Sequence, residues 1–366
     1  MSIRVLHLSC DDKFTDIALR GFEKVLPNSN SLLVYSKRDL TFIKSQCEHI
    51  KNEDLILKNV LMYTFDLIVI HCLNECWVNL ILQLPKDIKI IWLGWGYDYY
   101  DLIDIDLYLP LTKNIVNKKS FLNLIKSKFK KNKKIERKKK AVGRINYFSP
   151  VLELEYYQVK KKFSGMKFPE YIDFNYGSLD VDFIKGFEGR RVNGHGILIG
   201  NSATYENNHL DIFHLLNRVC VKKYKFIVPL SYGVDKYGEI LKNRVTDKEN
   251  VIFLDNYMPL DDYINVIIEC DNVIMGHIRQ QALGNILSML YLGAKVFLLE
   301  RNPIYTYLKE NGLYVYSIEE LLEDPTLLDI KIDIKHIIEN RKILAILWSE
   351  SIFVEKINKI TQLVII

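Results

Sequence analysis

The feature that most constrains the fold of this chain is an alternation of short apolar runs with longer amphipathic ones, which occurs twice along the sequence. The apolar runs are rich in Ile, Val and Leu, which is typical of parallel strands buried on both faces. Two successive strand-then-helix series predict an α/β protein with two doubly wound domains that face a cleft. The expected strands are Arg4–Leu8, Ser31–Tyr35, Asp66–Ile70, Lys89–Leu93 and Arg144–Phe148, then Gly196–Gly200, Tyr224–Val228, Asn250–Leu254, Asn272–Met275 and Ala294–Leu298.

The length of 366 residues suits two domains better than one. Polar residues and glycines interrupt the alternation between Phe174 and Arg191, so we expect residues 1–180 and 181–340 to form the two domains. A long helical pattern runs from Ile334 to Lys359. We expect the C-terminal residues, 341–366, to form a helix that packs back on the first domain.

The segment Met275–Asn285 follows an apolar strand and precedes a helix-like run. Free backbone N–H groups and the helix dipole favour an anion at such a helix N-terminus. Arg279 adds a guanidinium whose fork suits phosphate, and Gln280 and Gln281 add polar side chains beside it. The segment therefore predicts a phosphorylated ligand.

Polar side chains follow other expected strands of the second half as well, where an open α/β sheet binds its ligands. Gly200 permits a close approach of the backbone to a ligand. Tyr232 offers a ring that can stack on a base or a sugar. Each of these loops alone is equally typical of an ordinary strand-to-helix turn. Together they extend the predicted site to Gly200, Asn201, Ser202, His209, Tyr232, Gly284 and Asn302.

In the first half, Trp92–Tyr100 carries two Trp, two Gly, an Asp and three Tyr after a strand. Aromatic rings and a carboxylate are suited to binding a sugar, so Trp95, Asp98 and Tyr100 are candidates for contact with an acceptor or a sugar. The alternative is a packed corner of the domain. Asp12 and His71 also lie at strand ends, where they are candidates for proton transfer.

A strongly basic arm lies within residues 121–140. Its segment Lys126–Lys140 carries ten Lys or Arg against one Glu, a charge of +9 within a total of +5. Basic residues with a few apolar anchors suit an anionic membrane surface, although a solvated loop is equally compatible with the pattern. We expect no nucleic-acid binding, because no known motif accompanies the arm and the remaining chain is mildly acidic.

Other patterns narrow the class of protein. No Gly-x-Gly-x-x-Gly motif and no P-loop follows a strand, which argues against dinucleotide dehydrogenases and P-loop NTPases. The N-terminus lacks the pattern of a signal peptide, and no apolar run approaches the length of a membrane span. Cys72 and Cys76 have no second pair, so zinc is not expected. We expect a reduced, cytoplasmic protein.

The strand-end residues resemble, in the same order, the TDP-N-acetylfucosamine:lipid II N-acetylfucosaminyltransferase family, glycosyltransferase family 56. Asp12 and His71 match the family more loosely. The residues that carry the resemblance are Gly200–Ser202 with Asn207 and His209, Val228–Pro229 with Tyr232, Arg279–Gln281 with Gly284, and Arg301–Pro303, together with Trp92, Trp95, Gly96, Asp98 and Tyr100.

The resemblance implies a GT-B-like fold, in which two Rossmann-like domains face a cleft and the second holds the donor. It implies a hexosyltransferase-type enzyme that transfers a deoxy or acetamido sugar from a dTDP-sugar to an undecaprenyl-diphosphate-linked saccharide. Such a reaction belongs to bacterial surface polysaccharide synthesis of the O-antigen or enterobacterial-common-antigen type. The enzyme would act peripherally at the inner face of the inner membrane.

The resemblance also implies that no metal is needed, because Arg279 and the helix N-terminus would stabilise the leaving diphosphate. Three alternatives stay open on the sequence. They are a transferase that uses a UDP- or GDP-sugar, a sugar-nucleotide epimerase of the same fold, and a non-catalytic binding protein.

Overall fold

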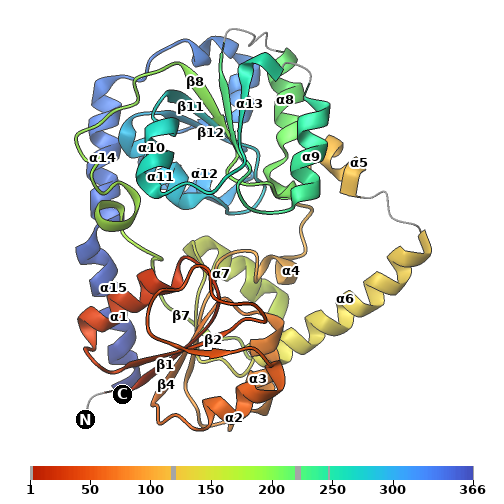
Figure 1. Cartoon of the computed structure of the whole chain (residues 1–366), viewed down its shortest axis with the longest axis vertical. Coiled ribbons are helices and arrows are strands. Elements are labelled where there is room, and N and C mark those ends of the chain that lie inside the picture. Colours follow the sequence, from red (N-terminus) through yellow and green to blue (C-terminus); the bar gives the residue numbers. More distant parts are fainter. Residues whose placement is uncertain (1–2, 117–120, 219–223, 246–247, 366) are drawn as a thin grey trace. The chain divides into compact units, whose positions relative to one another are not determined.

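The computed structural model describes residues 3–116, 121–218, 224–245 and 248–365, with the backbone alone at 121–131, 248 and 364–365. The chain forms two compact α/β units (Figure 1). Unit 1 comprises residues 1–105, 121–178 and 348–366, and unit 2 comprises residues 106–120 and 179–347. Residues 106–120 therefore belong to unit 2, although the sequence pattern placed them in the first domain, residues 1–180.

The sheet of unit 1 has seven parallel strands in the order β3-β2-β1-β4-β5-β6-β7. Its strands are β1 (Val5–Cys10), β2 (Asn30–Tyr35), β3 (Glu48–Ile50), β4 (Leu67–His71), β5 (Ile90–Leu93), β6 (Tyr147–Ser149) and β7 (Glu170–Tyr171). The central strands β1, β4 and β5 are almost wholly buried, as their apolar sequences predict.

The sheet of unit 2 has six parallel strands in the order β10-β9-β8-β11-β12-β13. Its strands are β8 (Gly196–Ile199), β9 (Phe226–Pro229), β10 (Val251–Leu254), β11 (Cys270–Met275), β12 (Lys295–Leu298) and β13 (Tyr316–Ser317). All strands pair in parallel, so the loops that follow β8, β9 and β11 leave the sheet at the same edge.

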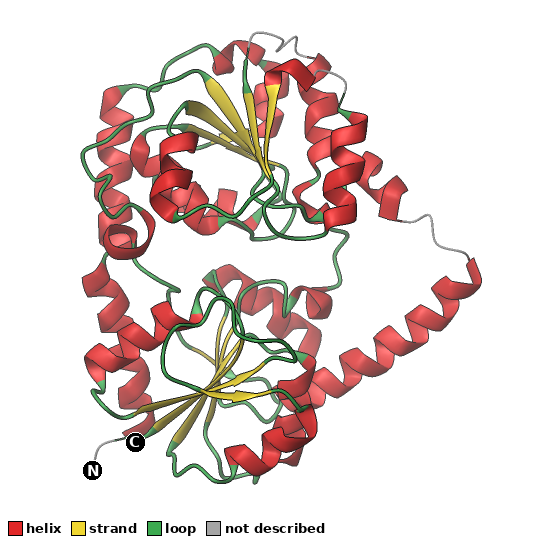
Figure 2. Ribbon diagram, in the orientation of Figure 1, coloured by secondary structure: helices red, strands yellow, loops and turns green. Residues whose placement is uncertain are grey.

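Helices cover both sides of each sheet (Figure 2). Those of unit 1 are α1 (Thr15–Val25), α2 (Ile56–Val60), α3 (Glu75–Gln83), α4 (Tyr100–Ile103), α6 (Phe121–Val142), α7 (Glu153–Lys160) and α15 (Glu350–Ile365). Those of unit 2 are α5 (Pro110–Val116), α8 (His209–Arg218), α9 (Asp235–Arg244), α10 (Leu260–Ile267), α11 (Leu283–Leu292), α12 (Pro303–Glu310), α13 (Ile318–Glu323) and α14 (Ile334–Trp348). Short 3-10 or π-helical turns lie at Glu53–Leu55, Lys161–Phe163, Leu179–Phe183, Tyr205–Asn207, Lys248–Asn250 and Pro325–Leu328.

The C-terminal helical pattern is two helices instead of one, because the chain leaves the helical conformation at Ser349, between α14 and α15. Helix α15 packs against α1 within unit 1. A Cβ atom at Gly21 of α1 would lie 2.4 Å from Ile357 Cδ1 and 2.5 Å from the Phe353 ring. Only glycine lets the two helices approach this closely.

Helix α5 belongs to unit 2 because a buried carboxylate fixes its first turn. Asp211 of α8 accepts hydrogen bonds from the N–H groups of Leu111 and Thr112 and from the Thr112 hydroxyl, at 2.8, 3.0 and 2.7 Å. Asn208 accepts the N–H of Leu109 at 2.9 Å. These bonds stabilise α5 as a carboxylate near a helix N-terminus does.

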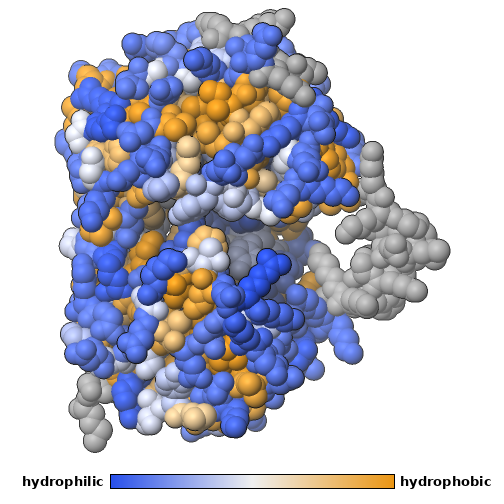
Figure 3. Space-filling view, in the orientation of Figure 1, coloured by the Kyte–Doolittle hydropathy of each residue, from blue (hydrophilic) through white to orange (hydrophobic). Residues whose placement is uncertain are grey.

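Apolar and hydrophilic side chains alternate in patches on the face drawn in Figure 3. Within the described ranges, none of the helices combines the length and the apolar character that crossing a bilayer requires.

Candidate functional site

Three strand-end loops of unit 2 meet through their side chains. Asn201 follows β8, Tyr232 follows β9 and Gln281 follows β11. The Asn201 amide donates to the Tyr232 hydroxyl oxygen at 2.7 Å, and its carbonyl oxygen accepts from the Gln281 amide at 3.0 Å. The fold therefore brings together three of the residues that the sequence singled out.

Gly200 and Asn207 form the turn beneath these side chains. Gly200 has a φ of +66°, and a Cβ atom there would lie 2.4 Å from His209 Nε2 and 2.6 Å from Asn207 Oδ1. Asn207 Oδ1 accepts the Asn201 N–H at 2.8 Å and faces His277 Nε2 at 2.9 Å. The position requires glycine for both its conformation and its space.

The loop between β11 and α11 is polar and yet buried. Arg279, Gln280 and Gln281 are only 9%, 6% and 8% exposed. The Arg279 guanidinium donates to the Gln280 carbonyl at 2.8 Å. Ala282 enters α11 with a φ of +63° and gives the helix no side-chain cap. A permanent cation and uncapped helical N–H groups thus lie within a few residues of each other.

Three buried polar atoms of this cluster have no hydrogen-bond partner within the described part of the chain: His209 Nε2, His277 Nδ1 and Gln281 Oε1. Burial lowers the pKa of His209 to about 3, and burial, then Arg279, lowers that of His277, so both rings are neutral. An unpartnered buried polar atom costs about 1–3 kcal/mol. A bound ligand that hydrogen-bonds to these atoms would remove that cost.

The tautomer of His277 follows from its partner. The Asn207 amide nitrogen donates to Ser202 Oγ and to Thr204 Oγ1, at 3.1 and 2.8 Å, which leaves Asn207 Oδ1 as an acceptor. His277 therefore carries its proton on Nε2, and its Nδ1 is an acceptor. His277 was not singled out from the sequence, although it lies two residues before Arg279.

Other expected site residues of unit 2 support the loops from beneath. Asn302 is fully buried, caps α12 by accepting the Ile304 N–H at 2.8 Å, and donates to the His277 carbonyl at 3.0 Å. A Cβ atom at Gly284 would lie 3.3 Å from the Phe183 ring, so this glycine allows α11 to pack closely. These two residues position the cluster instead of lining it.

In unit 1 the Trp92–Tyr100 loop is held by its own polar groups. Asp98 is 3% exposed and accepts three N–H groups, those of Leu73, Trp95 and the Trp92 ring, each at 2.8 Å. The Tyr100 hydroxyl donates to the buried Glu155 at 2.6 Å. Both side chains thus organise the loop, as in a packed corner.

Trp95 differs from its neighbours because ring contacts hold it in place. Its ring packs edge-on against Phe14, Tyr97 and Tyr176, with centroids 5.6–6.4 Å apart. Its buried ring N–H lies near the Tyr176 hydroxyl, although the two do not form a hydrogen bond of regular geometry.

Asp12 binds the start of α1. Its carboxylate accepts from the N–H groups of Phe14 and Thr15, at 2.6 and 3.0 Å, and from the hydroxyls of Thr15 and Ser9, at 2.6 and 2.9 Å. Burial nevertheless raises its pKa above the usual range. A raised pKa makes the carboxylate a stronger base than an exposed aspartate.

His71 lies inside unit 1, in a buried chain of hydrogen bonds. Asn30 Oδ1 faces His7 Nε2 at 3.2 Å, His7 Nδ1 faces His71 Nε2 at 3.0 Å, and His71 Nδ1 faces the Tyr176 hydroxyl at 2.9 Å. The Asn30 amide nitrogen donates elsewhere, so its oxygen accepts and each imidazole donates toward Asn30. Both nitrogens of His71 are engaged.

A family model described as 4-alpha-L-fucosyltransferase glycosyl transferase group 56 matches residues 125–351, more than half of the chain. The match confirms the resemblance drawn from the strand-end residues.

Solved structures with the same architecture cover nearly all of the chain. The α,α-trehalose 6-phosphate synthase of Burkholderia multivorans matches with a TM-score of 0.67 at 7% identity, over 99% of this chain and 98% of that one. The catalytic domain of starch synthase IV of Arabidopsis thaliana, bound to ADP and acarbose, gives 0.61 at 10%, over 100% and 99%. The lipopolysaccharide outer core galactosyltransferase WaaB gives 0.60 at 9%, over 98% of both chains. Identities this low show the fold alone, and they confirm the GT-B architecture.

Proposed function

The chain belongs to glycosyl transferase group 56, the 4-alpha-L-fucosyltransferase family, and from that premise we propose that it transfers a deoxy or acetamido sugar from a dTDP-sugar to an undecaprenyl-diphosphate-linked saccharide. The reaction would serve the synthesis of a bacterial surface polysaccharide at the inner face of the inner membrane. One observation carries the donor part of this proposal. A buried arginine lies where the loops after β8, β9 and β11 meet, together with three polar atoms that have no hydrogen-bond partner among the described residues.

Arg279 and the N–H groups that begin α11 stabilise the negative charge of the leaving diphosphate. Asn201, Ser202 and the backbone N–H groups of the Gln280–Gln281 loop donate to its oxygens. The Gln281 side-chain amide already donates to Asn201 and Thr204, and its Oε1 accepts from a hydroxyl or N–H group of the donor. Tyr232, whose side chain is 45% exposed, faces the ribose or the base. Because protein groups supply this stabilisation, we propose a metal-independent hexosyltransferase.

Asp12 is the proposed base that deprotonates the acceptor hydroxyl, since burial raises its pKa. Its four hydrogen bonds fix the orientation of the carboxylate. Trp95 offers its ring to the acceptor sugar. His71 stays a second candidate, and its complete burial limits it to acting through Tyr176.

A thermal-shift titration tests the donor assignment with dTDP, UDP and GDP. A ligand that binds only the native state stabilises it by about 2.7 kcal/mol at 100 times its Kd. We expect dTDP to stabilise the wild-type protein and to lose this effect in Arg279→Ala. The matched control, Arg218→Ala, alters an exposed arginine of α8 and should keep the full shift. Stabilisation by UDP or GDP instead would contradict the dTDP assignment.

The acceptor assignment needs a separate assay. Incubating the enzyme with the nucleotide sugar should give transfer only when a polyprenyl-diphosphate-linked saccharide is present. Release of an epimerised nucleotide sugar without any acceptor would favour the epimerase alternative.

Among the described side chains of the basic arm, that of Lys138 has a structural role. Lys138 is 5% exposed and donates to the Asp98 carbonyl oxygen and to the Asp101 carboxylate. Lys133 and Lys140 are exposed. Removing the whole arm would therefore disturb unit 1, whereas Lys133→Gln with Lys140→Gln changes only surface charge.

We propose that the arm binds an anionic membrane surface, where each lysine contributes about 1 kcal/mol. The double variant should bind phosphatidylglycerol vesicles about 30-fold more weakly in a flotation assay, as expected for a loss of about 2 kcal/mol. The matched pair Lys161→Gln with Lys162→Gln, exposed on unit 1 outside the arm, should bind like the wild type. Equal loss in both pairs would show a general charge effect without a role for the arm.

A further inference from the structure

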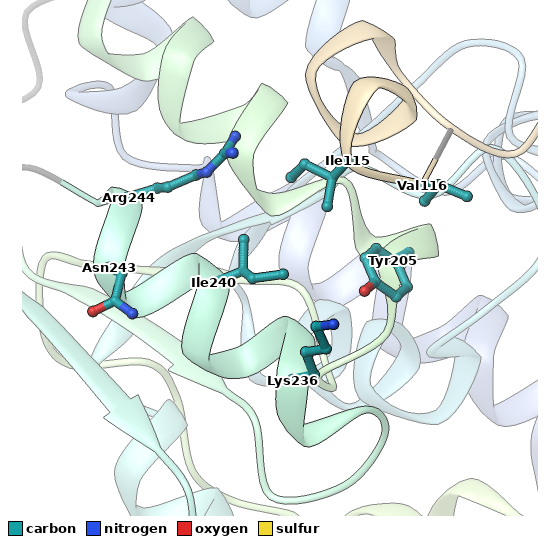
Figure 4. A pocket seen from close by; sticks show the side chains of 7 residues that line it. All are labelled: Ile115, Val116, Tyr205, Lys236, Ile240, Asn243 and Arg244. Atoms are coloured by element: carbon teal, nitrogen blue, oxygen red, sulfur yellow. The ribbon is translucent and has the colours of Figure 1, made fainter. Parts of the chain in front are cut away.

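A pocket of about 550 Å³ lies on unit 2, apart from the residues assigned to the donor. It is bounded by α5, by α9 and by Tyr205 of the loop after β8 (Figure 4). The seven residues that line it are Ile115, Val116, Tyr205, Lys236, Ile240, Asn243 and Arg244.

The walls of this pocket are firmly held. Asp211 fixes the first turn of α5 through the three hydrogen bonds to Leu111 and Thr112. The Tyr205 ring packs against the fully buried Tyr237 ring, with centroids 4.5 Å apart. A pocket with anchored walls is largely preformed, as ligand sites usually are.

The lining combines an apolar centre with two cations. Lys236, Ile240 and Arg244 are four residues apart along α9 and therefore share one helical face. Ile115 faces Ile240 across the pocket, and the two cations lie on either side of Ile240 (Figure 4). Eight helical residues span about 12 Å, so one small anion cannot cover the whole face.

The charge of the pocket is not neutralised by the described residues. No acidic residue is among those that line it, and neither Lys236 nor Arg244 has an ion-pair partner in the described ranges. Lys242 of the same helix, which does not line the pocket, pairs with Asp255 at 2.6 Å. Lys236 and Arg244, the two cations that face the pocket, are thus available to pair with an anionic ligand.

We infer that this pocket binds one anionic phospholipid of the bilayer, whose phosphate pairs with Lys236 or Arg244 while its chain lies on Ile115 and Ile240. An apolar surface beside cations matches an amphiphile with an anionic head. The site goes beyond the transfer reaction and is separate from the basic arm, because all seven lining residues belong to other elements. It gives unit 2 its own contact with the membrane.

Isothermal titration with dihexanoylphosphatidylglycerol, kept below its micelle concentration, tests the site on the full chain. We expect binding at least tenfold tighter than that of dihexanoylphosphatidylcholine. Lys236→Gln with Arg244→Gln should weaken it at least tenfold. The matched pair Lys335→Gln with Lys342→Gln removes two exposed charges from α14 and should stay within twofold.

Ile240→Trp fills the centre of the pocket and should also weaken binding at least tenfold, with an unchanged circular dichroism melting curve. Equal affinity for the two lipids, or unchanged affinity in the double variant, would overturn the assignment. Displacement by equimolar inorganic phosphate would show a simple anion site. If geranyl phosphate bound tenfold more tightly than the phospholipid, the pocket would be a site for an isoprenoid carrier. That result would overturn the assignment to a phospholipid of the bilayer. None of these readouts requires the transferase activity.

Discussion

The two units differ in how far the buried polar groups of their strand-end loops are hydrogen-bonded. In unit 1, Asp98 and Asp12 accept three and four hydrogen bonds, and both nitrogens of His71 are engaged. In unit 2, His277 and Gln281 each keep a buried atom without a partner among the described residues. Buried polar groups are normally satisfied, so we expect the hydrogen bonds of Asp98 to stabilise unit 1, and those of Asp12 to hold the proposed base in place. The acceptor atoms of His277 and Gln281 are the ones that we propose for a ligand.

The same residue types therefore have different significance according to their surroundings. When only the sequence is known, an aspartate that follows a strand suggests a binding or catalytic role. In the folded protein, Asp98 instead holds its loop together by hydrogen bonds. Substitution of Asp98 or His7 in unit 1 should mainly lower its stability, whereas substitution of Arg279 or Tyr232 in unit 2 should mainly lower catalysis or donor binding. The predictions below separate these outcomes.

The largest effect is expected for Arg279→Ala in unit 2. Loss of a preorganised charge contact lowers the rate by about 10²–10³-fold. Donor turnover at saturating acceptor measures it, with Arg218→Ala as the control. A rate within twofold of the wild type would remove Arg279 from the diphosphate site.

Asp98→Ala tests the opposite behaviour in unit 1. Three buried N–H groups lose their acceptor, and we expect the free energy of unfolding to fall by about 3 kcal/mol. All four tryptophans lie in unit 1, so urea unfolding followed by their fluorescence reports on this unit. Asp87→Ala, an exposed aspartate of the same unit, should change little. Full stability with lost activity would instead place Asp98 in the acceptor site.

The histidine chain of unit 1 should make stability depend on pH. Burial lowers the pKa of His7 to about 4, so the unfolded state binds the proton more tightly. The contribution is fully present above pH 6.5 and is lost as the pH falls toward 4. The loss in the free energy of unfolding reaches about 2 kcal/mol at pH 5. His7→Gln should flatten this dependence in tryptophan-monitored unfolding. The exposed His195 of unit 2, changed to Gln, should leave it unaltered.

Tyr232→Phe is expected to have the smallest effect. The Asn201 amide loses an acceptor, which costs about 1 kcal/mol in donor binding. The KM for the donor should rise about fivefold while kcat stays within twofold. Tyr157→Phe, on an exposed tyrosine of unit 1, is the matched control. A fall in kcat alone would mean that Tyr232 acts on the reacting sugar.

Sequence patterns located the strands that are long and buried, and they missed the short edge strands. All ten expected strands correspond to observed ones, whereas β3, β7 and β13 contain only two or three residues. An edge strand of that length buries too little surface to show an apolar run. The break at Ser349 was missed for a related reason, because apolar residues continue on both sides of it.

Those residues of the candidate site could be predicted whose side-chain type itself indicates how a ligand would be bound. Arg279, Asn201, Tyr232 and Gln281 were chosen from their place after strands, and the fold joins the last three by hydrogen bonds. His277 was not chosen, because a lone histidine in a loop is usually structural and its unpartnered nitrogen exists only in the folded protein.

By itself the sequence determined the α/β class, the GT-B fold and the family, and it predicted the strand ends at which we propose that ligands bind. Periodic burial and strand-end loops are local properties, so a linear pattern carries them. The tertiary structure decided which polar groups are already satisfied and which are left over. That distinction depends on partners distant in the sequence, such as Asp98 with Leu73 and Asn207 with His277. Hydrogen bonds between distant residues form only once the chain has folded.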